Sequence, residues 1–366
     1  MDWAVSVRWT RGLSSHPIRM LAARRAGLLS IRTFLRLPCW PPLPSGAAGP
    51  VIANVSGLRI HRREAALPEV RTHLIVAVIG AFPFLPAILS AAMPALKTIK
   101  HTEWLLDTGK NLQTSDGHMV KVWNFGHQPD QAVLSAWAQH IRRHYCADHE
   151  IDALRNGPGL SRAEFLRQIK LPDKAKDFGP GTRSGDFGEL LVADFLEFVL
   201  GYQVPRVRYD RKNTRNESTK GCDVIGIRVA NPKKASSKDA LIVFECKVQL
   251  TGKKAKARLQ DAIDDNGKDL ERLAEGLNAL RQRFLDRNDA DNGALIERFQ
   301  DMEDRPYASE WGAAAIFDDT LFDSVEIAKS KAAGHPQRAA LQLVVMKGKE
   351  MMPLVHALYE AAADEA

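Results

Sequence analysis

The chain has 366 residues and a net charge of +7, with 45% hydrophobic and 26% charged residues, a composition typical of a soluble protein of one or two domains. Its four cysteines, at positions 39, 146, 222 and 246, lack paired spacing, which excludes a disulfide framework and favours a reducing cytoplasm. Residues 1–96 hold eleven Arg, no Lys and three acids, a net of +8, so residues 97–366 carry −1. The total charge alone therefore does not indicate a nucleic-acid-binding protein.

Residues 1–96 differ in composition from the rest of the chain. The first 73 residues are rich in Arg, Trp, Pro and Ser and show no sustained hydrophobic period. Three explanations are open: a presequence, a disordered tail, or an upstream extension that is not part of the functional protein. The change in Arg and Lys usage near Lys97 favours the third, with Met93 as the start, so we expect residues 1–96 to be a disordered or spurious extension.

An uncharged run of 23 residues, 74–96, is long enough to cross a membrane. It contains Pro83, Pro86 and Pro94, which disfavour a continuous spanning helix. We therefore expect no membrane association, and a membrane-anchored protein remains an alternative.

Residues 97–175 are expected to form a small N-terminal α/β domain. The stretch HMVKVWNF, residues 118–125, predicts a strand. Residues 129–146 then predict a helix, because Pro129 suits a first turn and apolar residues recur at intervals of four.

A second, larger domain is expected from residue 176 to residue 366. Before it, Ser161 and Glu164 have the spacing of a capping box and predict a short helix. The Pro- and Gly-rich run 171–185 predicts a linker. This linker places the domain boundary near residue 175. The expected elements that follow are a helix at 186–200, strands at 203–210, 223–229 and 240–249, a helix at 254–287, strands at 313–317 and 340–346, and a terminal helix at 351–363.

The stretch IVFECKVQL, residues 242–250, has two charged residues inside an otherwise apolar strand pattern. Side chains alternate across a strand, so Glu245 and Lys247 share one face, and Cys246 points to the other face as a packing residue. One explanation is a half-exposed edge strand whose polar face meets water. The other is a site that uses both charges.

Asp223 stands at the start of the preceding strand. A turn residue or cap would explain it, but an antiparallel hairpin between the two strands would bring it toward Glu245 and Lys247. Carboxylate and carbonyl oxygens are ligands that Mg²⁺ prefers. Asp223, Glu245 and the carbonyl of Cys246 are therefore candidate metal ligands, and Lys247 is a candidate for orienting water or stabilising charge on a phosphodiester.

Glu189 is a third acidic candidate. Asp186 and Glu189 have the spacing of a capping box at the start of the helix expected at 186–200. The alternative is that Glu189 points toward the strands as a further metal ligand or water contact. Both interpretations stay open.

Basic residues are concentrated around these candidates. Residues 206–258 hold fifteen Lys or Arg and five acids, a net of +10, whereas residues 259–327 carry −11. Such a surface attracts a polyanion, although a solvated basic face is the simpler explanation. The candidate DNA contacts are Arg206, Arg208, Arg211, Lys212, Lys220, Lys253 and Lys254.

A weaker candidate is a zinc site in HIRRHYCADHE. His140 and His144 share a helical face, but Cys146 and His149 lie at the end of that helix. Zinc is therefore a minor alternative.

The order of Glu189, Asp223 and Glu245-x-Lys247 on helix, strand and strand resembles the PD-(D/E)XK nuclease superfamily, whose core is a mixed sheet flanked by helices. The stretches SGDFGELLVADFLE, KGCDVIGI and FECKVQL are, more narrowly, similar to the HamA family, the nuclease subunit of the Hachiman antiphage defence system. The resemblance covers about residues 115–366.

The resemblance implies a bacterial cytoplasmic DNase that depends on Mg²⁺ or Mn²⁺ and works on DNA with a superfamily 2 helicase, HamB. Asp223, Glu245 and Lys247 carry over as catalytic, together with Glu189. Two features depart from the pattern: the N-terminal 96 residues, and Cys222 in place of the Pro that precedes the first motif Asp. A non-catalytic nucleic-acid-binding or assembly subunit with the same fold remains the alternative, and retention of all three motif residues counts against it.

Overall fold

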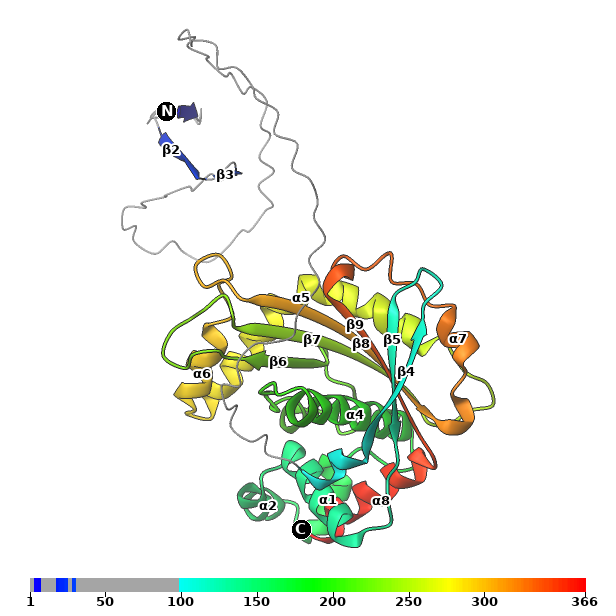
Figure 1. Ribbon diagram of the computed structural model, residues 1–366. Helices are drawn as coiled ribbons and strands as arrows, with labels where there is room; N and C mark the ends of the chain where they lie inside the picture. The colour runs from blue at the N-terminus through cyan, green and yellow to red at the C-terminus, as the bar shows by residue number, and fades with distance from the viewer. Residues whose placement is uncertain (1–2, 8–17, 26–27, 31–98) are drawn as a thin grey trace, which may run out of the picture. The chain divides into compact units, whose positions relative to one another are not determined.

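The structure is a computed structural model, and it describes residues 3–7, 18–25, 28–30 and 99–366 (Figure 1). The chain divides into two compact units, Met1–Ala87 and Ile88–Ala366. In the first unit, β1 (Trp3–Val7), β2 (Ile18–Arg25) and β3 (Leu28–Ser30) form a three-stranded antiparallel sheet. The apolar run 74–96 and the expected start at Met93 lie outside the described residues.

The second unit is built on a six-stranded mixed sheet with the order β4-β5-β9-β8-β7-β6. Strands β5, β9, β8 and β7 run parallel to one another, and β4 and β6 pair antiparallel at the two edges. The expected α/β class, a mixed central sheet flanked by helices, is confirmed. The strands are β4 (Leu105–Gln113), β5 (Met119–Phe125), β6 (Val224–Arg228), β7 (Ala240–Gln249), β8 (Ala308–Asp318) and β9 (Leu341–Gly348).

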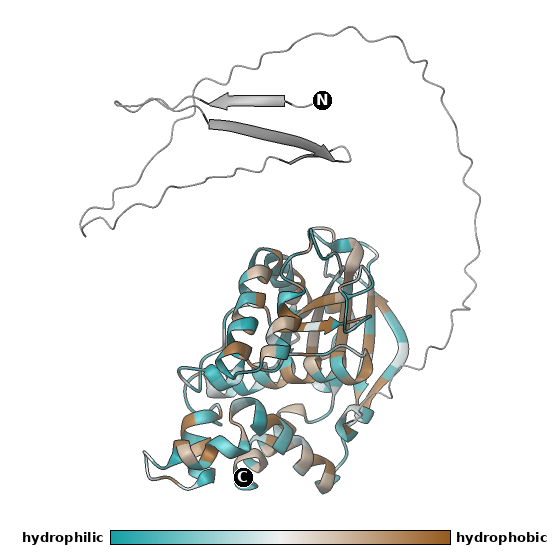
Figure 2. Ribbon diagram, turned by 90° about the vertical axis from the view of Figure 1, so that its left-hand side faces the viewer, coloured by the Kyte–Doolittle hydropathy of each residue, from teal (hydrophilic) through white to brown (hydrophobic). Residues whose placement is uncertain are grey.

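Helices cover both faces of this sheet (Figure 1). One face packs against α4 (Gly179–Asp194), beside α1 (Gln131–Tyr145) and α8 (Met351–Asp364), and the other packs against α5 (Arg258–Asp286), which contacts α6 (Ala290–Glu297). The three shorter helices are α2 (Asp148–Arg155), α3 (Arg162–Phe165) and α7 (Ser324–Ala328). Helices α2 and α3 contribute to the cluster under α4, and α7 contributes to the cluster under α5. The hydrophobic residues concentrate on the strands and on the inner sides of the helices (Figure 2).

Strand β7 separates two hydrophobic clusters because its side chains alternate between the faces. Ile242, Phe244 and Cys246 belong to the cluster under α4, and Leu241 and Val243 belong to the cluster under α5. The strand pairs with β8 along its full length and with β6 only as far as Phe244. Glu245 is buried although it lies beyond the β6 ladder, so the explanation of a polar face that meets water is wrong for this residue.

The boundary expected near residue 175 does not divide the structure. Strands β4 and β5, from the segment expected as a separate domain, belong to the same sheet as β6–β9, and β5 pairs directly with β9. The supposed linker is also partly helical, because α4 begins at Gly179 with a proline in its first turn. Proline is tolerated there because the first N–H groups of a helix need no internal partner.

Two other predictions are wrong. Residues 203–210 form no strand: Gln203 makes one isolated bridge to Ile227, and the chain then continues as a loop into a 3₁₀ turn, Tyr209–Arg211. Pro129 lies before the N-cap of α1 rather than in its first turn, since Asp130 is the cap. The capping box of Ser161 and Glu164 is confirmed.

Candidate active site at the end of strand β6

The site forms where β6 stops and β7 continues. The first residue of β6, Val224, pairs with Phe244, where the ladder between the two strands ends. Strand β7 continues beyond this pair to Gln249. Asp223 immediately precedes β6, and its Oδ2 accepts a hydrogen bond of 3.1 Å from the backbone N–H of Cys246. The Asp223 carboxylate thus accepts the hydrogen bond that a further residue of β6 would accept if the strand were longer. The predicted antiparallel hairpin and the approach of Asp223 to Glu245 are confirmed.

The same geometry leaves a carbonyl available. Within a strand, the N–H and C=O of one residue point to the same side. Because the N–H of Cys246 points to Asp223, its C=O faces the same open edge, beyond the end of the β6 ladder. Its thiol is buried under α4 as predicted.

Glu245 and Lys247 project on the α5 side of the sheet. Lys247 Nζ donates to Glu245 Oε1 at 2.6 Å and lies 2.8 Å from Asp265 Oδ2 of α5. Burial lowers the pKa of Lys247, but its hydrogen bonds to Asp265 and Glu245 outweigh burial and raise the pKa above the ordinary value. Lys247 is consequently a cation at neutral pH.

Glu189 approaches from the other face of the sheet, in the middle of α4. Its Oε2 accepts a hydrogen bond of 2.7 Å from the Tyr209 hydroxyl and lies 3.6 Å from Nε of Arg208. Asp186 is likewise buried within α4, where Tyr145 and Lys212 donate to it. The capping-box explanation is therefore wrong, because both acids lie more than one turn inside the helix.

Burial dominates the electrostatics of these acids. Burial, together with the smaller effect of the neighbouring Asp223, raises the pKa of Glu189 to about 8 and that of Glu245 to about 9. Asp269 of α5 is fully buried, and its pKa rises to about 6 for the same two reasons. Repulsion among carboxylates of this kind is relieved by a bound cation or by protons.

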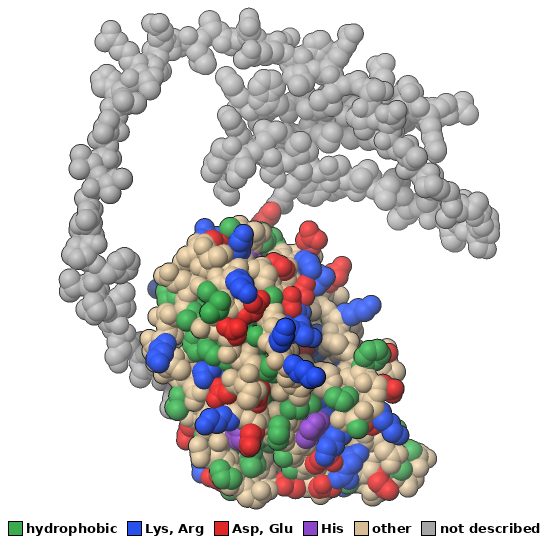
Figure 3. All heavy atoms as spheres, turned by 90° about the vertical axis from the view of Figure 1, so that its right-hand side faces the viewer, with side chains coloured by type: hydrophobic (Ala, Val, Ile, Leu, Met, Phe, Trp, Pro, Cys, Tyr) green, Lys and Arg blue, Asp and Glu red, His purple; other side chains and the backbone are tan. Residues whose placement is uncertain are grey.

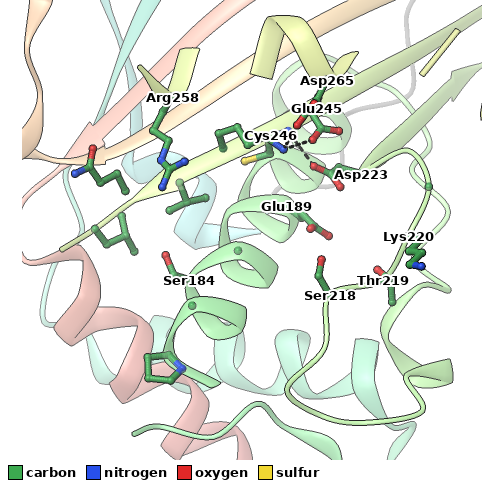
Figure 4. A pocket seen from close by; sticks show the side chains of 18 of the residues that line it. Ser184, Glu189, Ser218, Thr219, Lys220, Asp223, Glu245, Cys246, Arg258 and Asp265 are labelled. Carbon is green, nitrogen blue, oxygen red and sulfur yellow. Dashed lines mark hydrogen bonds and ion pairs between the residues drawn. The ribbon is translucent and has the colours of Figure 1, made fainter. Parts of the chain in front are cut away.

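Glu189, Asp223, Glu245 and Lys247 line a cleft of about 1130 Å³. In Figure 4, Glu189, Asp223 and Glu245 lie next to one another, with Lys220 on one side of them and Arg258 on the other. The remaining walls come from α4, the 218–221 loop, the end of β7, α5 and α8. An elongated polyanion could follow such an arrangement past the carboxylates.

Three of the seven candidate DNA contacts are engaged inside the protein. Arg206 pairs with Asp194 and Glu197, Lys212 pairs with Asp186, and Arg208 bonds to Asp223 Oδ1 at 3.1 Å and also donates to the backbone carbonyls of Thr219 and Cys222. The DNA-contact interpretation is wrong for these three, because their cationic groups already have buried partners. Arg208 instead fixes the first carboxylate of the site.

The other candidates remain accessible. Lys220, Lys253 and Lys254 are exposed, and Lys220 lines the cleft. Arg211 is half exposed and lies near Asp210 and Asp286. Three further cations line the cleft and were not predicted from the sequence: Lys256, Arg258 and Arg272. The first two follow the end of β7 closely in the chain, which was the available signal.

The donor set fits a hard divalent cation through two carboxylates and one carbonyl: Asp223, Glu245 and Cys246. Among the residues that the structure describes, no three His, Cys, Asp or Glu side chains are grouped to enclose a metal ion. Glu189 lines the same cleft and stays a candidate ligand. The zinc interpretation of His140 finds no support either, since its Nε2 hydrogen-bonds to Asp194 at 3.0 Å.

A family model described as HamA matches residues 100–362. The chain belongs to the HamA family. This membership implies a role in Hachiman antiphage defence, and the match includes every residue of the candidate site. No curated protein matches the chain. Within the described part of the HamA chain, no helix is both long enough and apolar enough to span a bilayer.

Proposed function

We propose that the chain is a metal-dependent deoxyribonuclease that hydrolyses DNA phosphodiester bonds as the effector of a Hachiman complex with a superfamily 2 helicase. The observation that carries the proposal is the open edge beyond β6, where Asp223, Glu245 and the outward-facing carbonyl of Cys246 meet beside Lys247. Membership of the HamA family supports the defence role and agrees with a partner subunit.

The residues divide the work by chemistry. Mg²⁺ or Mn²⁺ held by Asp223, Glu245 and the Cys246 carbonyl would act as a Lewis acid and lower the pKa of a bound water. Lys247 carries a positive charge and would stabilise the negative charge that develops on the phosphate. Because Lys247 holds its proton tightly, it serves as an electrostatic group and not as a general base.

Glu189 has a different task. In the metal-free chain burial and Asp223 raise its pKa to about 8, so at neutral pH it is largely protonated there and can donate a hydrogen bond. Tyr209 holds the carboxyl in place at 2.7 Å. Replacement of Glu189 by Gln should therefore reduce cleavage less than replacement of Asp223 or Glu245.

The proposal is tested with purified protein, its helicase partner, plasmid DNA and Mg²⁺. Asp223→Ala, Glu245→Gln and Lys247→Ala should each lower the cleavage rate by about 100-fold or more, while Lys233→Gln, in the loop at the other end of the β6–β7 hairpin, should cleave like wild type. Equal cleavage by wild type and the three site variants would remove the assigned site. DNA binding without cleavage by the complete complex would favour the non-catalytic alternative.

A further inference from the structure

The ammonium group of Lys247 lies between two carboxylates from different elements. Glu245 Oε1 is 2.6 Å away on the same strand, and Asp265 Oδ2 is 2.8 Å away on α5. The other oxygen of Asp265 bonds to Lys268 Nζ at 2.6 Å, so the Asp265 carboxylate is held on both sides. Its side chain is one-third exposed and lines the cleft.

In this arrangement Lys247 and a bound cation would compete for the Glu245 carboxylate. The carboxylate that is the best candidate for a metal ligand is also the hydrogen-bond acceptor of Lys247. A cation that binds both oxygens of Glu245 must displace the ammonium, and a cation on Oε2 alone repels it. A lysine whose side chain is three-quarters buried is costly to leave unpaired. Among the residues that the structure describes, Asp265 is the only other ion-pair partner of Lys247.

We propose that Asp265 is a positioning residue for Lys247: it keeps the ammonium group beside the metal site when Glu245 turns to the cation. This inference rests on the proposed function and assigns a role to a residue outside the nuclease motif. Asp265 lowers the cost of metal binding because Lys247 retains one anionic partner throughout. Without Asp265, Lys247 competes with the metal for Glu245.

A simple charge effect would also weaken metal binding, since Asp265→Asn removes a negative charge near the site. The two effects differ in their dependence on Lys247. The charge effect persists when Lys247 is absent, whereas the positioning effect disappears. A double-mutant cycle therefore separates them.

The test is calorimetric titration of Mn²⁺ into the full chain. Asp265→Asn should weaken Mn²⁺ binding about tenfold in the wild-type background and less than about twofold in the Lys247→Ala background. Asp265→Glu should restore binding to within about threefold of wild type, because it returns the carboxylate. Asp264→Asn is the matched control: Asp264 is exposed, bonds to Gln260 on the same helix, and should leave binding unchanged.

The outcomes distinguish the two proposals. If wild type binds Mn²⁺ and Asp265→Asn weakens binding equally in both backgrounds, Asp265 acts only through its charge and the positioning role is overturned. Failure of Asp265→Glu to restore binding, with an unchanged thermal unfolding midpoint, contradicts it as well. If wild type itself does not bind Mn²⁺, the metal-dependent function fails instead.

Discussion

Asp269 is the most unusual residue beside the candidate site. Its side chain is completely buried, and neither carboxyl oxygen has a hydrogen-bond partner among the described residues. The nearest cation, Nη1 of Arg272, is 3.7 Å from Oδ1. A buried carboxylate that accepts no hydrogen bond and has only a distant cation destabilises the fold when it is charged, so this acid is a local weakness in the helix that supports the site.

Asp269 predicts a specific pH dependence of stability. Its pKa is about 6 in the folded chain against 3.8 ordinarily, so the folded state binds the extra proton and the free energy of unfolding falls as pH rises between these values. At pH 8, Asp269→Asn should be more stable than wild type by about 1–3 kcal/mol. Near pH 4 the difference should vanish.

Urea unfolding of both chains at pH 4, 6 and 8 measures this difference. Glu271→Gln, on the exposed side of the same helix, is the matched control and should show no such trend. An Asp269→Asn chain that is less stable than wild type at pH 8 would mean that the carboxylate has a stabilising partner.

At the scale of elements, the contact between α4 and β7 sets the position of Glu189. A Cβ atom on Gly188 would lie 2.2 Å from Val248 Cγ2 and 3.2 Å from Cys246 Sγ. Side chains of β7 therefore fill the space that a side chain at position 188 would need. Glu189, the next residue, reaches the site only because of this close approach.

Gly188→Ala should force α4 away from β7. We expect a loss of about 1–3 kcal/mol in the free energy of unfolding from overpacking, together with reduced cleavage because Glu189 moves with the helix. Gly185→Ala, one turn earlier and with nothing within 4 Å of the added Cβ, should instead gain up to about 1 kcal/mol from helix propensity. Urea unfolding of the two variants distinguishes these outcomes, and equal stabilities would contradict the packing argument.

The sequence predicted the site best where its geometry is local. The alternation in residues 242–250 and the hairpin with Asp223 need only strand periodicity and a short loop. Asp265 and Tyr209 were missed because their distance from Lys247 and Glu189 depends on how elements pack, which no local pattern encodes. Arg208 was misassigned because its charge alone does not tell whether the guanidinium meets a phosphate or a buried carboxylate.

The helices and strands, too, were predicted where a local sequence pattern defines them and missed where it does not. The strands with long apolar runs and the long amphipathic helix were predicted, since hydrophobic periodicity directly reports burial. The start of α4 was missed because Gly179 and Pro180 resemble a loop, although both are compatible with a first helical turn. The exposed edge strand β4 has a largely polar pattern, which gave no strand signal.

At the scale of the whole molecule, residues 176–366 should not fold alone. Strand β9 would lose its parallel partner β5 along the register from Val120–Leu343 to Phe125–Gly348. Helix α8 would lose α1, including the 2.8 Å hydrogen bond between the hydroxyls of Tyr145 and Tyr359. Near-UV circular dichroism and limited proteolysis should show a native chain for residues 99–366 and an unfolded or aggregated one for 176–366, and a native signal from the shorter chain would contradict this.

Charge on the molecular surface is mixed. Figure 3 shows one face on which Lys and Arg side chains are interspersed with Asp and Glu. DNA affinity should then depend on the few cations of the cleft. Lys220→Gln and Lys256→Gln should each make the negative slope of log K against log salt shallower by about 1. Lys233→Gln should leave the slope unchanged. Fluorescence anisotropy of labelled DNA without divalent metal measures the slopes, and equal slopes for all three variants would place the DNA elsewhere.

The position of β9 has a consequence for the timing of folding during synthesis. This strand lies between β5 and β8 in the sheet, yet it follows both of them in the chain. A ribosome must therefore have produced β9 before β5 and β8 can be joined. We expect a nascent or truncated chain without β9 to lack an assembled site, so that the activity proposed above would begin only after β9 has been made.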